Sequence, residues 1–277
     1  MSNAGVMDVA ALRAFYERPP AEAAADAGWA EAHASLLGAL ESGAIRSAEP
    51  DGEGGWRVNA WVKQAILAGF RATKMVLMEG PGFPFVDKTA FPPRVLSLEA
   101  GIRMVPGGSS LRRGTFVAPG VTVIPPAFIN MGAWVDEGTM IDSHALVGSC
   151  AQIGRRVHLS AAAQIGGVLE PAGAQPVIVE DDAFVGGLVG VFEGVRVRRR
   201  AVLASGVILT ASTVIYDLVN DCQWIREVPE DAVVVPGARP AKGAFAEARG
   251  LTLAAPMIVK YRDARTDAAT ALEGALR

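Results

Sequence analysis

A strict six-residue repeat runs through the middle of this sequence and constrains its fold more than any other feature. Between residues 111 and 165 every sixth residue is aliphatic: Leu111, Val117, Val123, Ile129, Val135, Ile141, Val147, Ile153, Leu159 and Ile165. A small or β-branched residue follows four positions after each of the first nine. Because 51% of the chain is hydrophobic, ten such positions in a row would arise by chance about once in a thousand. This periodicity is typical of a parallel β-helix.

The repeat has a simple physical basis. Each hexapeptide supplies one short strand and one turn, and three hexapeptides close one triangular coil whose aliphatic residues point inward. Neighbouring coils pair their backbones and bury apolar surface that a single coil would leave exposed. The strands of a sandwich would instead alternate with period two and turn about every eight to twelve residues. We therefore predict a mainly β protein built on a left-handed parallel β-helix of hexapeptide repeats.

The sequence on either side of the repeat divides the chain into three predicted parts. Residues 6–100 contain helical periodicities and form an N-terminal helical domain, with a Gly- and Pro-rich linker near residues 80–93. Residues 101–237 form the β-helix, and residues 238–277 form a small C-terminal strand and helix cap. Within the cap we expect a strand over 256–261 and a helix over 267–276. A cap is expected because it covers the exposed strand edges at the end of a β-helix.

The repeat is interrupted once. Val179, where the second run begins, lies fourteen positions after Ile165, and fourteen is not a multiple of six. We therefore predict a loop at 167–176 that projects from one corner of the prism. Loops on rigid scaffolds often carry function, and a tolerated surface insertion is the equal alternative.

Composition excludes several classes of protein. The net charge of −3 gives no electrostatic case for nucleic-acid binding. Two cysteines, Cys150 and Cys222, do not make a disulfide framework. We find no apolar run of membrane-spanning length and no signal peptide, so we expect a cytoplasmic protein without a membrane partner.

More specific strings lie within the repeat. They are INMGAWVDEGTMID over 129–142, VGSCAQIG over 147–154, VHLS over 157–160 and IGGVLEP over 165–171. Together with segments 103–106 and 233–237, they closely resemble the tetrahydrodipicolinate N-succinyltransferases of the hexapeptide-repeat acyltransferase superfamily. The likeness covers most of the chain, including the N-terminal helices.

The resemblance implies an enzyme that moves a succinyl group from succinyl-CoA to the amine of hydrated, acyclic tetrahydrodipicolinate, in the diaminopimelate branch of lysine synthesis. It implies a homotrimer with active sites between neighbouring β-helices, and no metal is expected. Arg103 and Asp142 match the family's substrate-contacting Arg and Asp; Ser160 and Glu170 complete the predicted substrate-binding set. The planar fork of an arginine suits a substrate carboxylate, and Asp142 could orient or deprotonate the attacking amine.

One departure from the family pattern concerns the base. Several members have a Glu after an Arg-Ser pair in the segment that here covers 185–194, and that Glu, the proposed catalytic base, aligns with Gly190. Glycine cannot move protons. Either Asp142 suffices, or a nearby group such as Glu193 takes the role, or the substrate differs. Glu193 also suits a structural turn residue at a corner.

Acyl transfer from a thioester to an amine needs a positioned amine, an acceptor for its proton and a donor to the thioester oxygen. Besides Asp142 and Glu193, the candidate proton acceptors are His144, His158 and Glu170. Other hexapeptide acyltransferases use a histidine, which favours His144 over His158, because a histidine in the repeat is more often packed or hydrogen-bonded. Glu170 is alternatively a solvated loop carboxylate.

A CoA-dependent enzyme must bind the phosphates and the pantetheine arm of CoA. We predict phosphate contacts from Arg239 and Lys242, and pantetheine contacts at Ala204, Ser205 and Gly206, where small residues permit close approach. A basic run at Arg196 and 198–200 is another candidate, although such runs are usually solvated faces.

Three rival functions remain. An N-acetyltransferase of the same fold, acting with acetyl-CoA on a related amino diacid, is the nearest. A zinc hydratase of the β-helix type needs three histidine ligands, and with His33 in the helical region only His144 and His158 remain in the repeat. A purely structural protein is disfavoured by Arg103 and Asp142.

Overall fold

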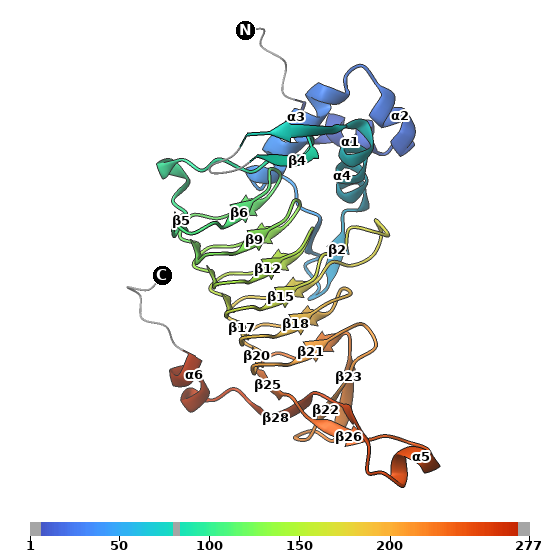
Figure 1. Ribbon diagram of the computed structural model, residues 1–277, viewed down its shortest axis with the longest axis vertical. Coiled ribbons are helices and arrows are strands. Elements are labelled where there is room, and N and C mark those ends of the chain that lie inside the picture. Colours follow the sequence, from blue (N-terminus) through green and yellow to red (C-terminus); the bar gives the residue numbers. More distant parts are fainter. Residues whose placement is uncertain (1–6, 80–83, 271–277) are drawn as a thin grey trace.

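A prism of stacked parallel coils forms the centre of the computed structural model, which describes residues 7–79 and 84–270 (Figure 1). Three parallel sheets make its walls. The first wall contains β5 (Arg103–Met104), β8 (Thr122–Val123), β11 (Met140–Ile141), β14 (His158–Leu159), β17 (Phe184–Val185), β20 (Val202–Leu203) and β25 (Ala232–Val235).

The second wall contains β6 (Ser110–Leu111), β9 (Phe128–Ile129), β12 (Leu146–Val147), β15 (Gln164–Ile165), β18 (Gly190–Val191) and β21 (Ile208–Leu209). The third contains β7 (Phe116–Val117), β10 (Trp134–Val135), β13 (Gln152–Ile153), β16 (Ile178–Val179), β19 (Arg196–Val197) and β24 (Glu227–Val228). The chain passes from the first wall to the second and then to the third, so each coil has three corners.

The hexapeptide repeat forms the core of this prism, as predicted. Each aliphatic repeat residue from Leu111 to Ile165 is at most 4% exposed, and those from Val179 to Ile215 are at most 1% exposed. They belong to one continuous hydrophobic cluster. The predicted parallel β-helix is therefore confirmed.

The interruption after Ile165 is a long turn in an otherwise regular coil. On the preceding coil, four residues (148–151) join the second wall to the third, whereas twelve residues (166–177) join β15 to β16. The register is restored beyond it, since Val179 pairs with Ile153 and Val191 pairs with Ile165. The eight additional residues therefore project from the corner without shifting the coils below.

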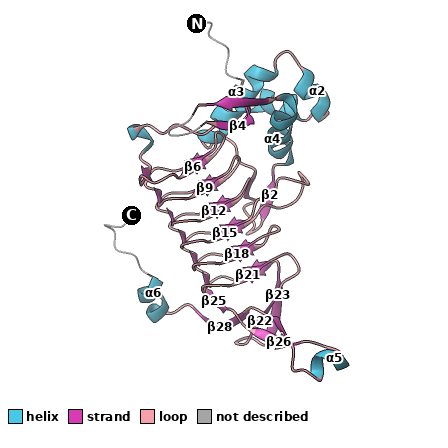
Figure 2. Ribbon diagram, in the orientation of Figure 1, coloured by secondary structure: helices cyan, strands magenta, loops and turns pink. Residues whose placement is uncertain are grey.

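Helices gather at the two ends of the prism (Figure 2). The N-terminal part contains α1 (Val9–Tyr16), α2 (Pro20–Ala25), α3 (Trp29–Glu41), α4 (Ala60–Ala72) and the short helix η1 (Leu98–Ala100). The sequence did not predict its two antiparallel hairpins, β1 (Ala48–Pro50) with β2 (Trp56–Val58), and β3 (Met75–Met78) with β4 (Phe85–Lys88). Part of the expected linker therefore forms β4, and residues 80–83 of it lie outside the described residues.

The N-terminal part covers the third wall. The guanidinium of Arg46 lies 4.0 Å from the ring centroid of Trp134 and donates from Nε to Oε1 of Gln152 at 2.8 Å. Met131 and Cys150, from two coils, join the hydrophobic cluster of the helices. This contact fixes the helical part against the prism.

The C-terminal part closes the lower end of the prism. The hairpin of β22 (Val214–Asp217) and β23 (Cys222–Ile225) precedes β24, and β28 (Met257–Tyr261) pairs with both β22 and β25. Beyond it lie the β26 (Ala238–Pro240) and β27 (Thr252–Ala254) hairpin, α5 (Ala244–Glu247) and α6 (Ala264–Thr270). The predicted strand at 256–261 corresponds to β28; the predicted helix begins earlier, at Ala264, and its residues 271–276 lie outside the described residues. The division of the chain at 100 and 237 stays a prediction.

Within residues 7–79 and 84–270, no helix is both long and apolar enough to span a membrane.

Candidate active site

Several predicted site residues stack at the corner between the first and second walls, which we call the first corner. The backbone N–H of Asp142 donates to the carbonyl of Leu159, and the N–H of Ser160 donates to the carbonyl of Val185. Gly186 and Ala204 occupy the equivalent position on the next two coils and make the equivalent backbone hydrogen bond. At about 4.8 Å between paired strands, Asp142 and Ala204 are about 14 Å apart along the prism. The structure therefore brings Asp142, Ser160 and Ala204 into one column.

Arg103 lies on the wall that leads to this corner. It belongs to β5, pairs with Thr122, and Thr122 pairs with Met140 two residues before Asp142. The side chain of Arg103 is exposed. Its strand lies two coils above β11, a separation of about 10 Å. Arg103 and Asp142 thus share the upper part of the same face.

The predicted CoA segment continues from the lower end of the column. A Cβ added to Gly206 would lie 3.8 Å from the ring of Pro236, and β26 begins two residues after that proline. Arg239 lies on β26, and Lys242 follows it in an exposed segment. The predicted pantetheine and phosphate residues therefore meet at one end of the prism.

Glu193 and Glu170 occupy a different corner, between the second and third walls. Both line a cavity of about 630 Å³ under the long turn, together with Phe192 and Arg226. The Oε2 atom of Glu193 accepts a hydrogen bond from the backbone N–H of Ala211 at 3.0 Å. Within one chain, therefore, neither glutamate faces Asp142, and the bond to Ala211 agrees with a turn-stabilising role for Glu193.

Phe192 fills the space beside Gly190. A Cβ added to Gly190 would lie only 2.4 Å from Cε2 of the Phe192 ring and 3.0 Å from Cδ1 of Ile208. A larger side chain at position 190 would have to displace that ring. The side chains of Phe192 and Ile208 thus occupy the space that a carboxylate side chain at position 190 would need.

The other histidines are packed. His158 is 9% exposed and stacks on Phe184, with ring centroids 5.0 Å apart. His33 lies among the N-terminal helices, and its Nε2 is 2.8 Å from the carbonyl oxygen of Ala90. Among the described residues, no group of three or more His, Cys, Asp or Glu side chains is placed to hold a metal ion.

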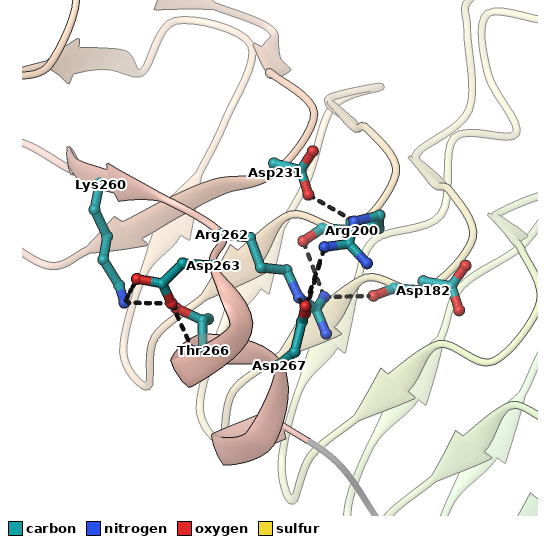
Figure 3. A network of polar contacts seen from close by, with 8 residues as sticks. All are labelled: Asp182, Arg200, Asp231, Lys260, Arg262, Asp263, Thr266 and Asp267. Atoms are coloured by element: carbon teal, nitrogen blue, oxygen red, sulfur yellow. Dashed lines mark hydrogen bonds and ion pairs between the residues drawn. The ribbon is translucent and has the colours of Figure 1, made fainter.

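The basic run at 198–200 pairs with acidic residues of neighbouring coils at the third corner, which lies between the third and first walls. Arg200 donates from Nε to Asp231 at 2.7 Å, and Arg262 donates to the backbone carbonyls of Asp182 and Arg200 at 3.0 Å and pairs with Asp267 (Figure 3). Further pairs at this corner and along the third wall are Arg156 with Asp182, Arg196 with Glu180, Arg198 with Glu227, and Arg199 with Glu230. This run therefore ties the coils and the C-terminal segment together.

Sequence reasoning missed a lysine that anchors the long turn. Lys63, on α4, is fully buried and donates from Nζ to the carbonyl of Ala174 at 2.5 Å. Burial lowers the pKa of Lys63. Its position on the apolar face of a helix, between Val62 and Ile66, is a signal visible in the sequence, but its partner in a distant turn is not.

These features define a class of protein: a hexapeptide-repeat acyltransferase, with small residues along one corner of a parallel β-helix. Two family models match the chain. One is described as tetrahydrodipicolinate N-succinyltransferase N-terminal and matches residues 12–72; the other is described as hexapeptide repeat of succinyl-transferase and matches residues 176–211.

Similar proteins extend the likeness over nearly the whole chain. The 2,3,4,5-tetrahydropyridine-2,6-dicarboxylate N-succinyltransferase of Rhodopseudomonas palustris (strain TIE-1) is 46% identical over 272 residues, which is 95% of each chain. The enzymes of that name from Nitrobacter winogradskyi and Bradyrhizobium diazoefficiens are 45% and 46% identical over 87% and 89% of each chain. The chain belongs to the 2,3,4,5-tetrahydropyridine-2,6-dicarboxylate N-succinyltransferase family.

Proposed function

We propose that this protein transfers a succinyl group from succinyl-CoA to the amine of hydrated, acyclic tetrahydrodipicolinate. The observation that carries the proposal is the column at the first corner, where Asp142 and Ser160 stack above Ala204. In this reading the upper coils bind the acceptor and the lower coils bind the donor. The reaction belongs to the diaminopimelate branch of lysine synthesis, and its small soluble reactants support a cytoplasmic enzyme.

The residues at each end of the column suit their reactant. The guanidinium of Arg103 offers a fork for an acceptor carboxylate. The carboxylate of Asp142 is held in place, because its Oδ1 accepts from the backbone N–H of Ser143 at 2.7 Å, and its remaining oxygen is available to orient the amine. The backbone at 204–206 can approach the pantetheine arm closely, and Arg239 and Lys242 supply charge for the CoA phosphates.

The transfer needs no covalent intermediate on the protein. The amine nitrogen attacks the thioester carbonyl, the carbon–sulfur bond breaks and CoA leaves as a thiol. Holding the two reactants in line removes most of the entropic barrier to a bimolecular step. A rigid prism whose coils are about 4.8 Å apart is suited to that task, because it fixes the spacing between acceptor and donor.

The lack of cationic side chains at the first corner favours acetyl-CoA as a second candidate acyl donor. Corner segments 124–127, 142–145, 160–163, 186–189 and 204–207 contain no Lys or Arg. A succinyl carboxylate would therefore need a cation from outside these segments, whereas an acetyl group would not. Transfer of an acetyl group from acetyl-CoA to a related amino diacid is the second candidate.

A homotrimer is the proposed assembly, with each site between two copies. The support is an apolar outer surface on the second wall and its corner, where Phe128, Ile208 and Leu188 are 36%, 49% and 69% exposed. Phe128→Glu should lower the mass measured by light scattering from three chains to one. Leu218→Glu, at another exposed apolar residue, is the matched control and should leave three. Equal masses for both variants would contradict the assignment of this wall to the interface.

The function is tested by thiol release from succinyl-CoA and acetyl-CoA in parallel, with tetrahydrodipicolinate as acceptor. We expect rapid release with succinyl-CoA and a loss of at least a hundredfold in kcat/KM for Asp142→Asn. Release with acetyl-CoA alone would make the protein an acetyltransferase. Release with neither donor would refute the proposed acceptor.

A further inference from the structure

We propose that His144 accepts the proton of the attacking amine, a role that rests on the proposed acyl transfer. His144 is exposed and lies two residues after Asp142, in the same turn of the first corner. Its side chain therefore begins within one turn of the carboxylate that orients the amine. The structure also explains why the other candidates are less suited.

The backbone of His144 is fixed by the coils on both sides. Its N–H donates to the carbonyl of Pro126 at 2.5 Å, and its own carbonyl accepts from Nε2 of Gln164 at 3.0 Å. The residue has φ of 62°, in the left-handed region, which closes the corner. Because both backbone groups are bonded to neighbouring coils, the imidazole projects from a rigid support.

His144 also belongs to a second column, next to that of Asp142. The backbone N–H groups of Ala162, Leu188 and Gly206 each donate to a backbone carbonyl in the turn of the preceding coil. These residues therefore occupy the position equivalent to that of His144 on the three coils below. Gly206 is part of the predicted pantetheine segment. A substrate lying along the corner between Asp142 and that segment would therefore run past the histidine.

Other proton acceptors are absent from the corner. In segments 124–127, 142–145, 160–163, 186–189 and 204–207, Asp142 and His144 are the only titratable side chains. The neighbouring positions on the second wall, Phe128 and Leu146, are uncharged. Glu193 lies at another corner, and position 190 is a glycine packed against Phe192.

Imidazole suits the proton balance of the reaction. As the amine nitrogen bonds to the thioester carbon, its proton passes to the ring nitrogen of His144. When the carbon–sulfur bond breaks, the imidazolium returns that proton to the leaving thiolate, so the products are the amide and the CoA thiol. Histidine changes its charge between about pH 5 and pH 8 and can perform both transfers near neutral pH.

The test compares His144→Asn with Asp221→Asn. Asparagine tolerates the left-handed region better than most residues, so the corner should keep its shape. Asp221 is an exposed residue with φ of 51° on a hairpin away from the corner, which makes it a matched control. Rates of thiol release would be recorded for each protein at varied concentrations of succinyl-CoA and acceptor, at one fixed pH near neutrality.

We expect His144→Asn to lower kcat about 10²- to 10⁴-fold, with KM changed less than about threefold. Asp221→Asn should keep the kcat and KM of the wild type. Added imidazole should restore part of the rate of His144→Asn and leave Asp221→Asn unchanged.

The outcomes separate this proposal from the proposed function. If the wild type turns over and His144→Asn retains its rate, the role of His144 is refuted and acyl transfer stands. If Glu193→Gln lowers kcat as strongly and His144→Asn does not, the base is Glu193 of another copy and the role of His144 is refuted. A wild type that releases no thiol with either donor would overturn both.

Discussion

A buried carboxylate at the lower end of the prism should contribute measurably to stability. Asp217 is 2% exposed, and its Oδ2 accepts from the hydroxyl of Tyr261 at 2.6 Å, Nδ2 of Asn220 at 3.0 Å and Nε1 of Trp224 at 3.4 Å. Its Oδ1 accepts from the backbone N–H groups of Val219 and Asn220 at 3.0 and 3.1 Å. Asp217→Asn removes the charge and turns an N–H₂ group toward donors.

The size of the effect follows from the pKa of Asp217. Burial alone would raise this pKa, but the hydrogen bonds from Tyr261, Asn220 and the backbone outweigh burial and lower it from 3.8 to about 2. At about 1.4 kcal/mol per pH unit, this difference corresponds to roughly 2–3 kcal/mol of folding stability. Because the folded-state pKa is depressed, the contribution is present above about pH 4 and is lost as pH falls toward 2.

Urea unfolding followed by tryptophan fluorescence, at one fixed protein concentration, measures this contribution. Asp217→Asn should lower the free energy of unfolding by about 2–3 kcal/mol at pH 7, and the difference from the wild type should shrink between pH 4 and pH 2. Asp221→Asn, an exposed residue of the same hairpin, should change it by less than about 0.5 kcal/mol. Equal stabilities of Asp217→Asn and the wild type at pH 7 would refute the reasoning.

Three further predictions concern the prism. A Cβ on Gly186 would lie 2.7 Å from the backbone nitrogen of Ser205, so Gly186→Ala should raise KM for acyl-CoA several-fold, whereas Gly173→Ala, with open space around it, should not; steady-state kinetics with each variant decide this. Burial raises the pKa of the Cys150 thiol from 9.0 to about 11, so the folded state favours the neutral thiol and loses up to about 3 kcal/mol of stability between pH 9 and pH 11. Cys150→Ala should remove this part of the alkaline loss in unfolding titrations. Arg200→Met breaks partly exposed ion pairs and should cost no more than about 1 kcal/mol in urea unfolding; a larger loss would show that these pairs act as a network.

The hexapeptide repeat was sufficient to predict the prism, because each inward residue is specified by its own hexapeptide. A strand and turn of six residues repeats the same burial on every coil, so the core from Leu111 to Ile215 can be read without knowing any distant contact. The hairpins in the N-terminal part were not predictable by this route, since β3 and β4 show no alternation of polar and apolar residues.

The arrangement of the site was decided by tertiary structure. The twelve-residue turn after Ile165 hid which corner each later residue occupies, so the sequence left open whether Asp142 and Glu193 face one cleft. The register of β16 and β18 places them at different corners. The sequence determined the coil and its inward face, because these depend on local period. Only the stacked coils brought Asp142 to the same corner as Ala204, and Lys63 to Ala174, because contacts between coils join residues that are eighteen or more positions apart.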